Sequence, residues 1–293
     1  MEYEIKPLSK EEAKLIDKKV GEYDDSLAVP DDGVPEDEDF VLKVEDETGS
    51  IIAGCVGGFY NWGQMEIDIL WVDERYRGRG LGSYLLCEAE HMARERGCYI
   101  SIVGSLSFEA KGLYEKHGYT VYKTVEDWPK GYLNYSLSKR LDTSIPDYIP
   151  KDNSLQAQFE IGRGSEEDAD RLWDALERFE YSFAPEKHDY IPLNRKLTAE
   201  DGGLVAGVLS GVNEWDGCFL DALWVEEPYR NRGLGSYLLA EAEREAKENG
   251  AAVVFVCTFD WAYTFFVKRG YTVTGCLEEH PRGHRMYTLE KRL

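Results

Sequence analysis

The sequence predicts an α/β fold of the α+β kind, a mixed sheet with flanking helices, that occurs twice in tandem. Two long segments repeat each other closely, and strand-like and helix-like patterns alternate within each repeat. The length of 293 residues suits two ordinary domains. With 43% hydrophobic residues, each repeat can bury a core of its own.

The internal repeat sets the domain boundaries. Residues 70–98 and 223–251 are identical at 20 of 29 aligned positions, with an offset of 153. A period this long is not that of a solenoid, so each repeat should be a separate domain. We predict a first domain over residues 1–141, a linker with Pro and Asp over 142–156, and a second domain over 157–293.

The elements of the first repeat follow from local patterns. Ser9 and Glu12 form a capping box that predicts a helix over about 10–22. An apolar face that ends at Gly97 predicts a helix over 83–96. Strands are expected over residues 2–8, 40–46, 51–60, 65–72, 98–105, 119–124 and 132–138, with a further short helix over 108–117. The order β-α-β-β-β-α-β-α-β-β predicts a mixed sheet in each domain.

A turn rich in glycine and arginine joins a strand to a helix at the same place in both repeats. It consists of Arg77, Gly78, Arg79, Gly80, Leu81 and Gly82 in the first repeat, and of Arg230, Asn231, Arg232, Gly233, Leu234 and Gly235 in the second. Glycine allows close approach of a ligand, and helix N–H groups and arginine bind phosphate. Glycine would also serve a tight connection for steric reasons alone. The recurrence of the pattern before an amphipathic helix favours a phosphate site in both repeats.

The R-x-x-G-x-G pattern resembles the signature of the GCN5-related N-acetyltransferases, and the strand order is similar to theirs over nearly the whole chain outside the linker. The resemblance implies two tandem acyl-CoA N-acyltransferase domains that use acetyl-CoA as cosubstrate. The pyrophosphate would lie on residues 77–82 and 230–235. The pantetheine arm would lie against Leu70, Trp71 and Val72 in the first repeat and Leu223, Trp224 and Val225 in the second. A backbone N–H there would polarise the acetyl carbonyl while an amine attacks the thioester directly.

The resemblance also implies a proton donor. Tyr114 matches the tyrosine that protonates the leaving thiolate in many members of the family. Its counterpart is Phe266, so we expect a catalytic first domain and a second domain that retains the coenzyme A loop but is weakly active or inactive. Tyr263, about one helical turn earlier, is an alternative donor.

Carboxylates on the fourth strand are candidates for the base. Asp68 and its counterpart Asp221 could accept the proton of the amine, or could instead hydrogen-bond a neighbouring loop. Glu66 of the first repeat is matched by Phe219 in the second. The acceptor side should be built from the acidic loop 31–39 and from the turn between the last two strands.

Charge restricts the partners. The net charge of −22 disfavours nucleic acids and anionic membranes and favours a cationic partner. We expect a small-molecule or peptide amine of cationic character as acceptor. The sequence has no membrane-spanning apolar stretch and no C-x-x-C pair, so we expect a cytoplasmic protein without a metal site.

Two alternatives remain open. The first is a non-catalytic acyl-CoA binding or sensing protein built from the duplicated fold. The second comes from the tandem arrangement, which is also similar to that of the mycothiol synthases and would imply a sugar-linked cysteine substrate.

Overall fold

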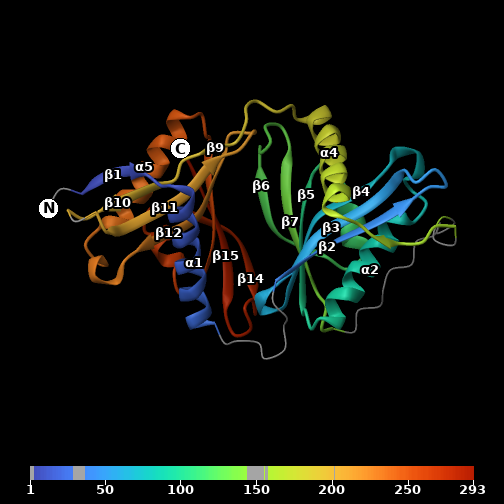
Figure 1. Ribbon diagram of the computed structural model, residues 1–293, viewed down its shortest axis with the longest axis horizontal. Coiled ribbons are helices and arrows are strands. Elements are labelled where there is room, and N and C mark those ends of the chain that lie inside the picture. The colour runs from blue at the N-terminus through green and yellow to red at the C-terminus, as the bar shows by residue number, and fades with distance from the viewer. Residues whose placement is uncertain (1–2, 29–36, 144–154, 156–157, 201) are drawn as a thin grey trace. The chain divides into compact units, whose positions relative to one another are not determined.

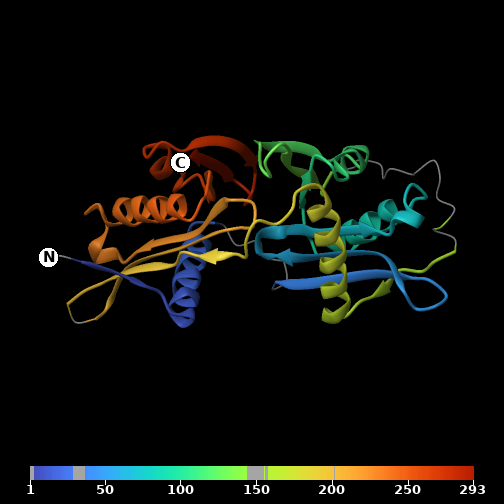
Figure 2. The same cartoon turned by 90° about the horizontal axis from the view of Figure 1, so that it is seen from above.

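The computed structural model describes residues 3–28, 37–143, 155, 158–200 and 202–293. The chain forms two compact units. Unit 1 comprises Met1–Pro30, Trp128–Lys130 and Glu186–Leu293, and unit 2 comprises Asp31–Asp127 and Gly131–Pro185. Each unit consists of a mixed sheet, as predicted, and helices lie on both of its faces (Figures 1 and 2).

Unit 2 is built mainly from the first repeat. Its elements are β2 (Glu38–Glu45), β3 (Ile51–Tyr60), η1 (Asn61–Gly63), β4 (Gln64–Val72), η2 (Glu74–Tyr76), α2 (Leu81–Glu95), β5 (Ile100–Leu106), α3 (Lys111–Lys116), β6 (Thr120–Glu126), β7 (Leu133–Arg140), β8 (Gly162–Arg163) and α4 (Glu166–Phe183). The strand order is β8-β2-β3-β4-β5-β7-β6, with β4 and β5 parallel and the other neighbours antiparallel. The predicted elements of the first repeat are confirmed to within a few residues.

Unit 1 has the same plan in the second repeat. Its elements are β1 (Glu4–Pro7), α1 (Lys10–Leu27), β9 (Ile191–Pro192), β10 (Arg195–Thr198), β11 (Leu204–Val212), β12 (Gly217–Val225), η3 (Glu227–Tyr229), α5 (Leu234–Glu248), β13 (Val253–Phe259), α6 (Tyr263–Val267), β14 (Thr272–Glu278) and β15 (Arg285–Arg292). The strand order is β1-β10-β11-β12-β13-β15-β14, β9 also pairs with β11, and β12 and β13 are parallel.

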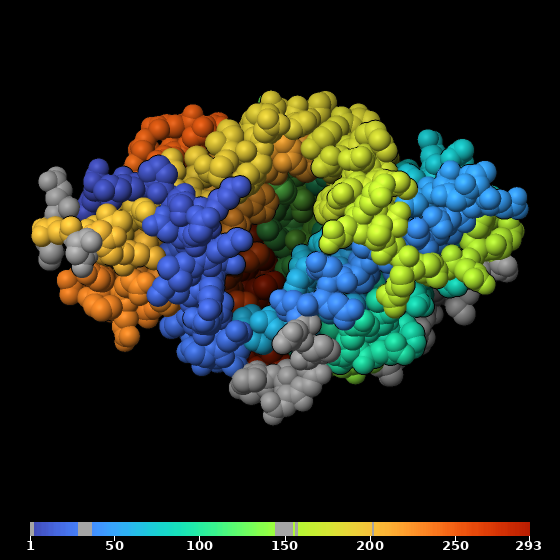
Figure 3. Space-filling model, in the orientation of Figure 1, coloured from blue at the N-terminus to red at the C-terminus, as the bar shows by residue number. Residues whose placement is uncertain are grey.

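The units do not coincide with the predicted boundaries 1–141 and 157–293, because the repeats exchange their first strand and helix. β1 and α1 come from the first repeat, yet β1 pairs with β10, and α1 packs on β11 and β12. In the same way, β8 pairs with β2, and α4 packs on β2, β3 and β4. In Figure 3, the dark blue surface of α1 adjoins the golden β10–β11 segment, and the yellow-green surface of α4 adjoins the blue strands β2 and β3. Most of the predicted linker, residues 144–154 and 156, lies outside the described residues.

Each exchanged helix packs over a glycine. Ile16 of α1 is fully buried, and a Cβ added to Gly207 would lie 2.6 Å from its Cδ1. Leu172 of α4 is buried over Gly54, where an added Cβ would lie 2.4 Å from Leu172 Cδ1. A larger residue at either position would force Ile16 or Leu172 to shift.

An ion pair reinforces each contact. Lys196 of β10 pairs with Glu12 of α1, and Lys43 of β2 pairs with Asp168 of α4 at 3.1 Å. The two lysines are matched residues of the two repeats. Each carboxylate also belongs to the capping box at the start of its helix.

Candidate active site

The two parallel strands of each unit separate part-way along their length. In unit 2, β4 pairs with β5 as far as Ile67 and Val103. In unit 1, β12 pairs with β13 as far as Leu220 and Val256. Beyond these residues the backbone groups that face the gap are available to a ligand.

A bulge in the antiparallel ladder lies at the point of separation. Val56 pairs with Ile69 and Gly57 pairs with Ile67, which leaves Asp68 as the extra residue of β4. The matched Asp221 is the extra residue of β12. A bulge redirects the side chains of a strand. Both aspartates singled out from the sequence are therefore placed at the end of the strand pairing.

The turn after each of these strands has the left-handed backbone that glycine favours. In unit 2, φ is 74° at Gly78 and 93° at Gly80, the N-cap of α2. In unit 1, φ is 60° at Asn231 and 84° at Gly233, the N-cap of α5. Since a glycine N-cap has no side chain to cap the helix, the first N–H groups can bind an anion.

The first arginine of each turn ties it back to the preceding strand. Arg77 Nε donates a hydrogen bond of 2.8 Å to the Val72 carbonyl, and Arg230 Nε donates one of 2.9 Å to the Val225 carbonyl. These matched bonds hold the turn next to the strand end where the resemblance places the pantetheine arm.

Each of these arginines also lies over an aromatic ring of an exchanged helix. The Arg77 guanidinium is 4.7 Å from the ring of Phe179 in α4. The Arg230 guanidinium is 5.2 Å from Tyr23 in α1 and 4.7 Å from Trp224. Phe179 and Tyr23 were not found from the sequence, because each lies outside the repeat whose turn it contacts.

In unit 1 the turn borders a cleft of about 810 Å³. Eight residues predicted to bind the cofactor line it: Leu223, Trp224, Val225, Arg230, Asn231, Gly233, Leu234 and Gly235. The ninth, Arg232, lies instead 5.7 Å from the ring of Tyr229. Helix α1 contributes Val20, Tyr23 and Asp24 to the lining, and the far wall includes Trp261, Phe265, Phe266 and Arg269.

Two carboxylates of unit 2 lie on β4 near the bulge. Burial, with a smaller contribution from the charge of Asp68, raises the pKa of Glu66 to about 6. Burial and the charge of Asp39 raise the pKa of Asp68 to about 6. In unit 1, burial also raises the pKa of Asp221. A carboxylate that titrates near neutral pH is suited to accept and release protons.

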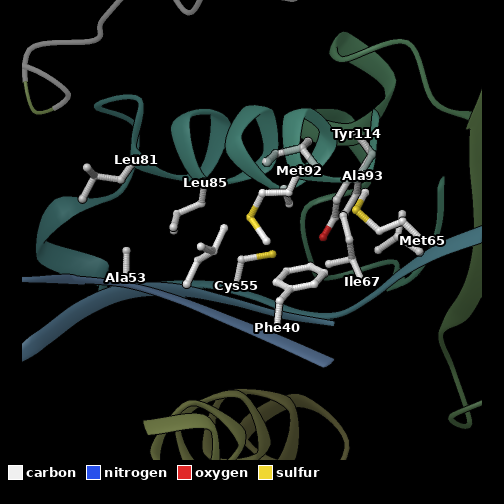
Figure 4. Close-up of a cluster of buried hydrophobic side chains, with 14 of the residues drawn as sticks. Phe40, Ala53, Cys55, Met65, Ile67, Leu81, Leu85, Met92, Ala93 and Tyr114 are labelled. Atoms are coloured by element: carbon white, nitrogen blue, oxygen red, sulfur yellow. The ribbon is translucent and has the colours of Figure 1, made fainter. Parts of the chain in front are cut away.

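The structure places Tyr114 within the hydrophobic core of unit 2. Its side chain is 5% exposed, and its hydroxyl is directed into the cluster formed by residues of α2 and the sheet (Figure 4). Burial raises its pKa well above the ordinary value, so the phenol stays protonated at neutral pH. Its counterpart Phe266 lines the unit 1 cleft, whereas Tyr263, the alternative donor, stacks on Tyr287 at 4.2 Å.

In each unit, a polar contact joins the residues just after the short helix α3 or α6 to the helix that follows the turn, α2 or α5. His117 Nε2 lies 2.9 Å from Ser83 Oγ in unit 2, and Arg269 Nε donates a 3.0 Å hydrogen bond to Ser236 Oγ in unit 1. These matched contacts connect two walls of each site, and the sequence analysis did not identify them.

Three further expectations concern the acidic loop, metal binding and membrane-spanning segments. Residues 31–36 of the acidic loop lie outside the described residues. In the described part of the chain, no group of three His, Cys, Asp or Glu side chains is arranged to hold a metal ion. No helix there combines the length and hydropathy that a membrane span requires.

Comparison with known proteins identifies a family. The model of the acetyltransferase (GNAT) family matches residues 8–119 and 154–271, which together make up most of the chain. The matches follow the order of the sequence, so each of them includes an exchanged helix together with the strands of its own repeat.

Three similar proteins carry related names. A blasticidin-S acetyltransferase from Streptomyces morookaense is 41% identical over 96 residues, which are 32% of this chain and 70% of that protein. Acetyltransferase Atu2258 from Agrobacterium fabrum is 31% identical over 108 residues, 37% of this chain and 78% of that protein. The crystal structure of an acetyltransferase from Bacillus cereus is 39% identical, with a TM-score of 0.44, covering 47% of this chain and 96% of that one.

Proposed function

The chain belongs to the GNAT family of acetyltransferases and is an acyltransferase, and we propose that unit 2 transfers an acetyl group from acetyl-CoA to a primary amine of a small cationic molecule or peptide. The observation that carries the proposal is the separation of β4 from β5 at the Asp68 bulge, beside the 77–82 turn.

The residues around the gap fit acetyl-CoA. The turn offers helix N–H groups and arginine to the pyrophosphate. A Cβ added to Gly78 would meet no atom within 4 Å, so a ligand can approach the backbone there. The pantetheine arm would extend from the turn along Leu70, Trp71 and Val72 to the point where the strands part.

Group transfer then requires no nucleophilic side chain. The amine nitrogen attacks the thioester carbonyl carbon, a C–N bond forms and the C–S bond breaks. A backbone N–H freed by the bulge stabilises the oxyanion. The amine proton passes to Asp68 or Glu66, directly or through water. The resemblance assigns the proton for the departing thiolate to Tyr114, whose hydroxyl, directed into the core in this structure, would have to turn toward the gap.

The acceptor side of unit 2 is acidic. Burial, together with the charges of Asp68, Glu66, Asp39 and Asp37, raises the pKa of Tyr60 to about 12, which places four carboxylates around one phenol. A cationic acceptor would be attracted to this set. This supports an amine with more than one positive charge.

The proposal is tested by measuring thiol release from acetyl-CoA with a panel of amines. The panel contains a polyamine, an aminoglycoside, a lysine peptide and blasticidin S, the last because of the name of one relative. We expect turnover with at least one of these amines and none with its fully N-acetylated form, which lacks the nucleophile. Thiol release at the background rate with every amine would refute the proposal.

A further inference from the structure

The side chain of Tyr60 lies beside the carboxylates of β4 and takes no part in the proton transfers described above. Tyr60 ends β3, two residues after Gly58, so both residues face the same side of the sheet. A Cβ added to Gly58 would lie 2.7 Å from Tyr60 Oη, which shows that the ring bends back over this glycine. Gly58 pairs with Glu66, two residues before the bulged Asp68. The phenol is therefore held next to the point where β4 leaves β5.

The Tyr60 hydroxyl is near Asp68 but is not bonded to it. Burial, and then the charge of Asp68 more than that of any other carboxylate, raises the pKa of Tyr60 to about 12, so the phenol stays protonated at neutral pH. Among the residues that the structure describes, none forms a hydrogen bond with this hydroxyl. Tyr60 is also only partly buried. Its hydroxyl oxygen is therefore free to accept a hydrogen bond from a ligand that Asp68 contacts as well.

Unit 1 has a tyrosine in the same arrangement. Gly211 is the counterpart of Gly58, and a Cβ added to Gly211 would overlap the ring and the hydroxyl of Tyr190. Burial raises the pKa of Tyr190, and the charge of Asp221, the counterpart of Asp68, adds to this effect. In both units, a phenol thus lies over the matched glycine and near the matched aspartate.

The two tyrosines come from different positions of the repeat. With the offset of 153, Tyr60 corresponds to Asn213, and Tyr190 corresponds to Asp37. Asn213 instead accepts hydrogen bonds from two backbone N–H groups of the turn before β12. Tyr190 directly precedes β9, which pairs with β11. Because duplication would have copied one position, a phenol that reaches the same place from two positions favours a role for its hydroxyl.

We propose that Tyr60 selects a primary amine as the acceptor, its hydroxyl oxygen accepting one N–H of the amine while Asp68 accepts the other. The proposal rests on the proposed function and adds the residue that orients the nitrogen. A neutral primary amine has two N–H groups and one lone pair, so binding both N–H groups leaves the lone pair to attack the thioester carbonyl carbon. As the C–N bond forms and the C–S bond breaks, the proton held by Asp68 passes to its carboxylate. The proton held by Tyr60 stays on the nitrogen of the product amide.

The test compares a primary amine with its N-methyl derivative. The pair consists of the panel amine that gives turnover and the same amine methylated at the nitrogen that reacts. A secondary amine has one N–H group and cannot bind both side chains at once, so the unaltered protein should have the higher kcat/KM for the primary amine. Tyr60→Phe should lower kcat/KM for the primary amine about tenfold, the effect of one hydrogen bond. The value for the N-methyl derivative should change little, so the ratio of the two values should also fall about tenfold.

Two controls separate recognition of the amine from a general effect on the protein. The KM for acetyl-CoA should stay unchanged in Tyr60→Phe, because the substitution keeps the ring that covers Gly58. Tyr237→Phe removes the hydroxyl of a tyrosine that is 49% exposed on α5, and it should leave the ratio unchanged. A ratio that Tyr60→Phe also leaves unchanged would overturn the proposal, while turnover by the unaltered protein would still support the proposed function.

A second measurement does not require turnover. Each amine of the panel is titrated by calorimetry into protein saturated with coenzyme A, and Tyr60→Phe should raise the Kd of the bound amine about tenfold. If the unaltered protein acetylates no amine, the proposed function fails, and this titration alone decides whether Tyr60 binds an amine. Equal Kd values in the two proteins, or no binding by any amine of the panel, would then overturn this proposal too.

Discussion

The residues that differ between the repeats are those on which proton transfer depends. Glu66 and Tyr114 of the first repeat become Phe219 and Phe266 in the second, while the turn keeps its arginines and both of its glycines in the R-x-x-G-x-G pattern. The bulged aspartate is kept as well. Ligand binding and catalysis can therefore be tested separately by single substitutions.

Tyr114→Phe should lower kcat by about 100-fold, the usual contribution of a general acid. The KM for acetyl-CoA should change little, because Phe266 shows that phenylalanine packs at this position without loss of contacts. Steady-state thiol release gives both constants, and a thermal melt of the variant checks its fold. An unchanged kcat would remove Tyr114 from the mechanism.

The pH dependence of kcat/KM should report the β4 carboxylates. A base must be deprotonated to act, so the rate should fall as the pH drops through about 6, the value to which burial raises the pKa of Glu66 and of Asp68. The charge of Asp68 contributes to the raised pKa of Glu66, so ionisation of Asp68 disfavours that of Glu66.

Asp68→Asn and Glu66→Gln should each lower kcat/KM and alter the fall of kcat/KM at low pH, here called the acidic limb. Glu115→Gln, which changes an exposed carboxylate paired with Lys111, is the matched control and should leave the limb in place. A profile that stays flat from pH 7 to pH 5 would exclude both carboxylates as the base.

At single positions, the turn glycines and Asp68 could be singled out from the sequence because a local pattern marks them. The structure gives Gly78 and Gly80 a positive φ and places Asp68 at a bulge, and the roles of these residues stay predictions. Phe179 and Tyr23, which contact the turn arginines, could not be predicted, because they belong to helices that pack on the sheet of the other repeat.

At the level of elements, each exchanged helix forms a separate hydrophobic cluster with its sheet, Ile16 with Leu209 and Ala222, and Leu172 with Val56 and Ile69. Ile16 of α1 is 0% exposed, and its packing over Gly207 closes one face of the unit 1 sheet. Ile16→Ala should therefore lower the free energy of unfolding of unit 1 by about 2–5 kcal/mol.

A control for this change is available on the same helix. Leu15 is 43% exposed, so Leu15→Ala should change the free energy of unfolding by less than about 0.5 kcal/mol. Urea denaturation measures both variants. Equal effects of the two substitutions would show that α1 does not pack through Ile16.

The strands and helices were predictable because each has a local pattern, but the exchange was not. Ile16 corresponds to Leu172, Gly207 corresponds to Gly54, and each sheet offers a matched lysine to the helix. Either helix could therefore pack on either sheet, and no local pattern in the sequence distinguishes the two pairings.

At the level of the whole molecule, the exchange should keep the halves of the chain together after the backbone is cut. A protease site inserted within residues 144–154 would separate β1 and α1 from the second repeat covalently while they remain part of unit 1. After cleavage, we expect both fragments to elute together in gel filtration at the position of the uncut protein. Separation of the fragments under native conditions would contradict the exchanged arrangement.

The two proposed ligand sites are the repeated turns 77–82 and 230–235, and both should bind acetyl-CoA. Calorimetric titration with acetyl-CoA of the unaltered protein, Gly80→Glu and Gly233→Glu tests it most directly. We predict two sites in the unaltered protein and one in each variant, since each glutamate blocks one phosphate turn. Absence of binding by the unaltered protein would contradict the assignment of both turns.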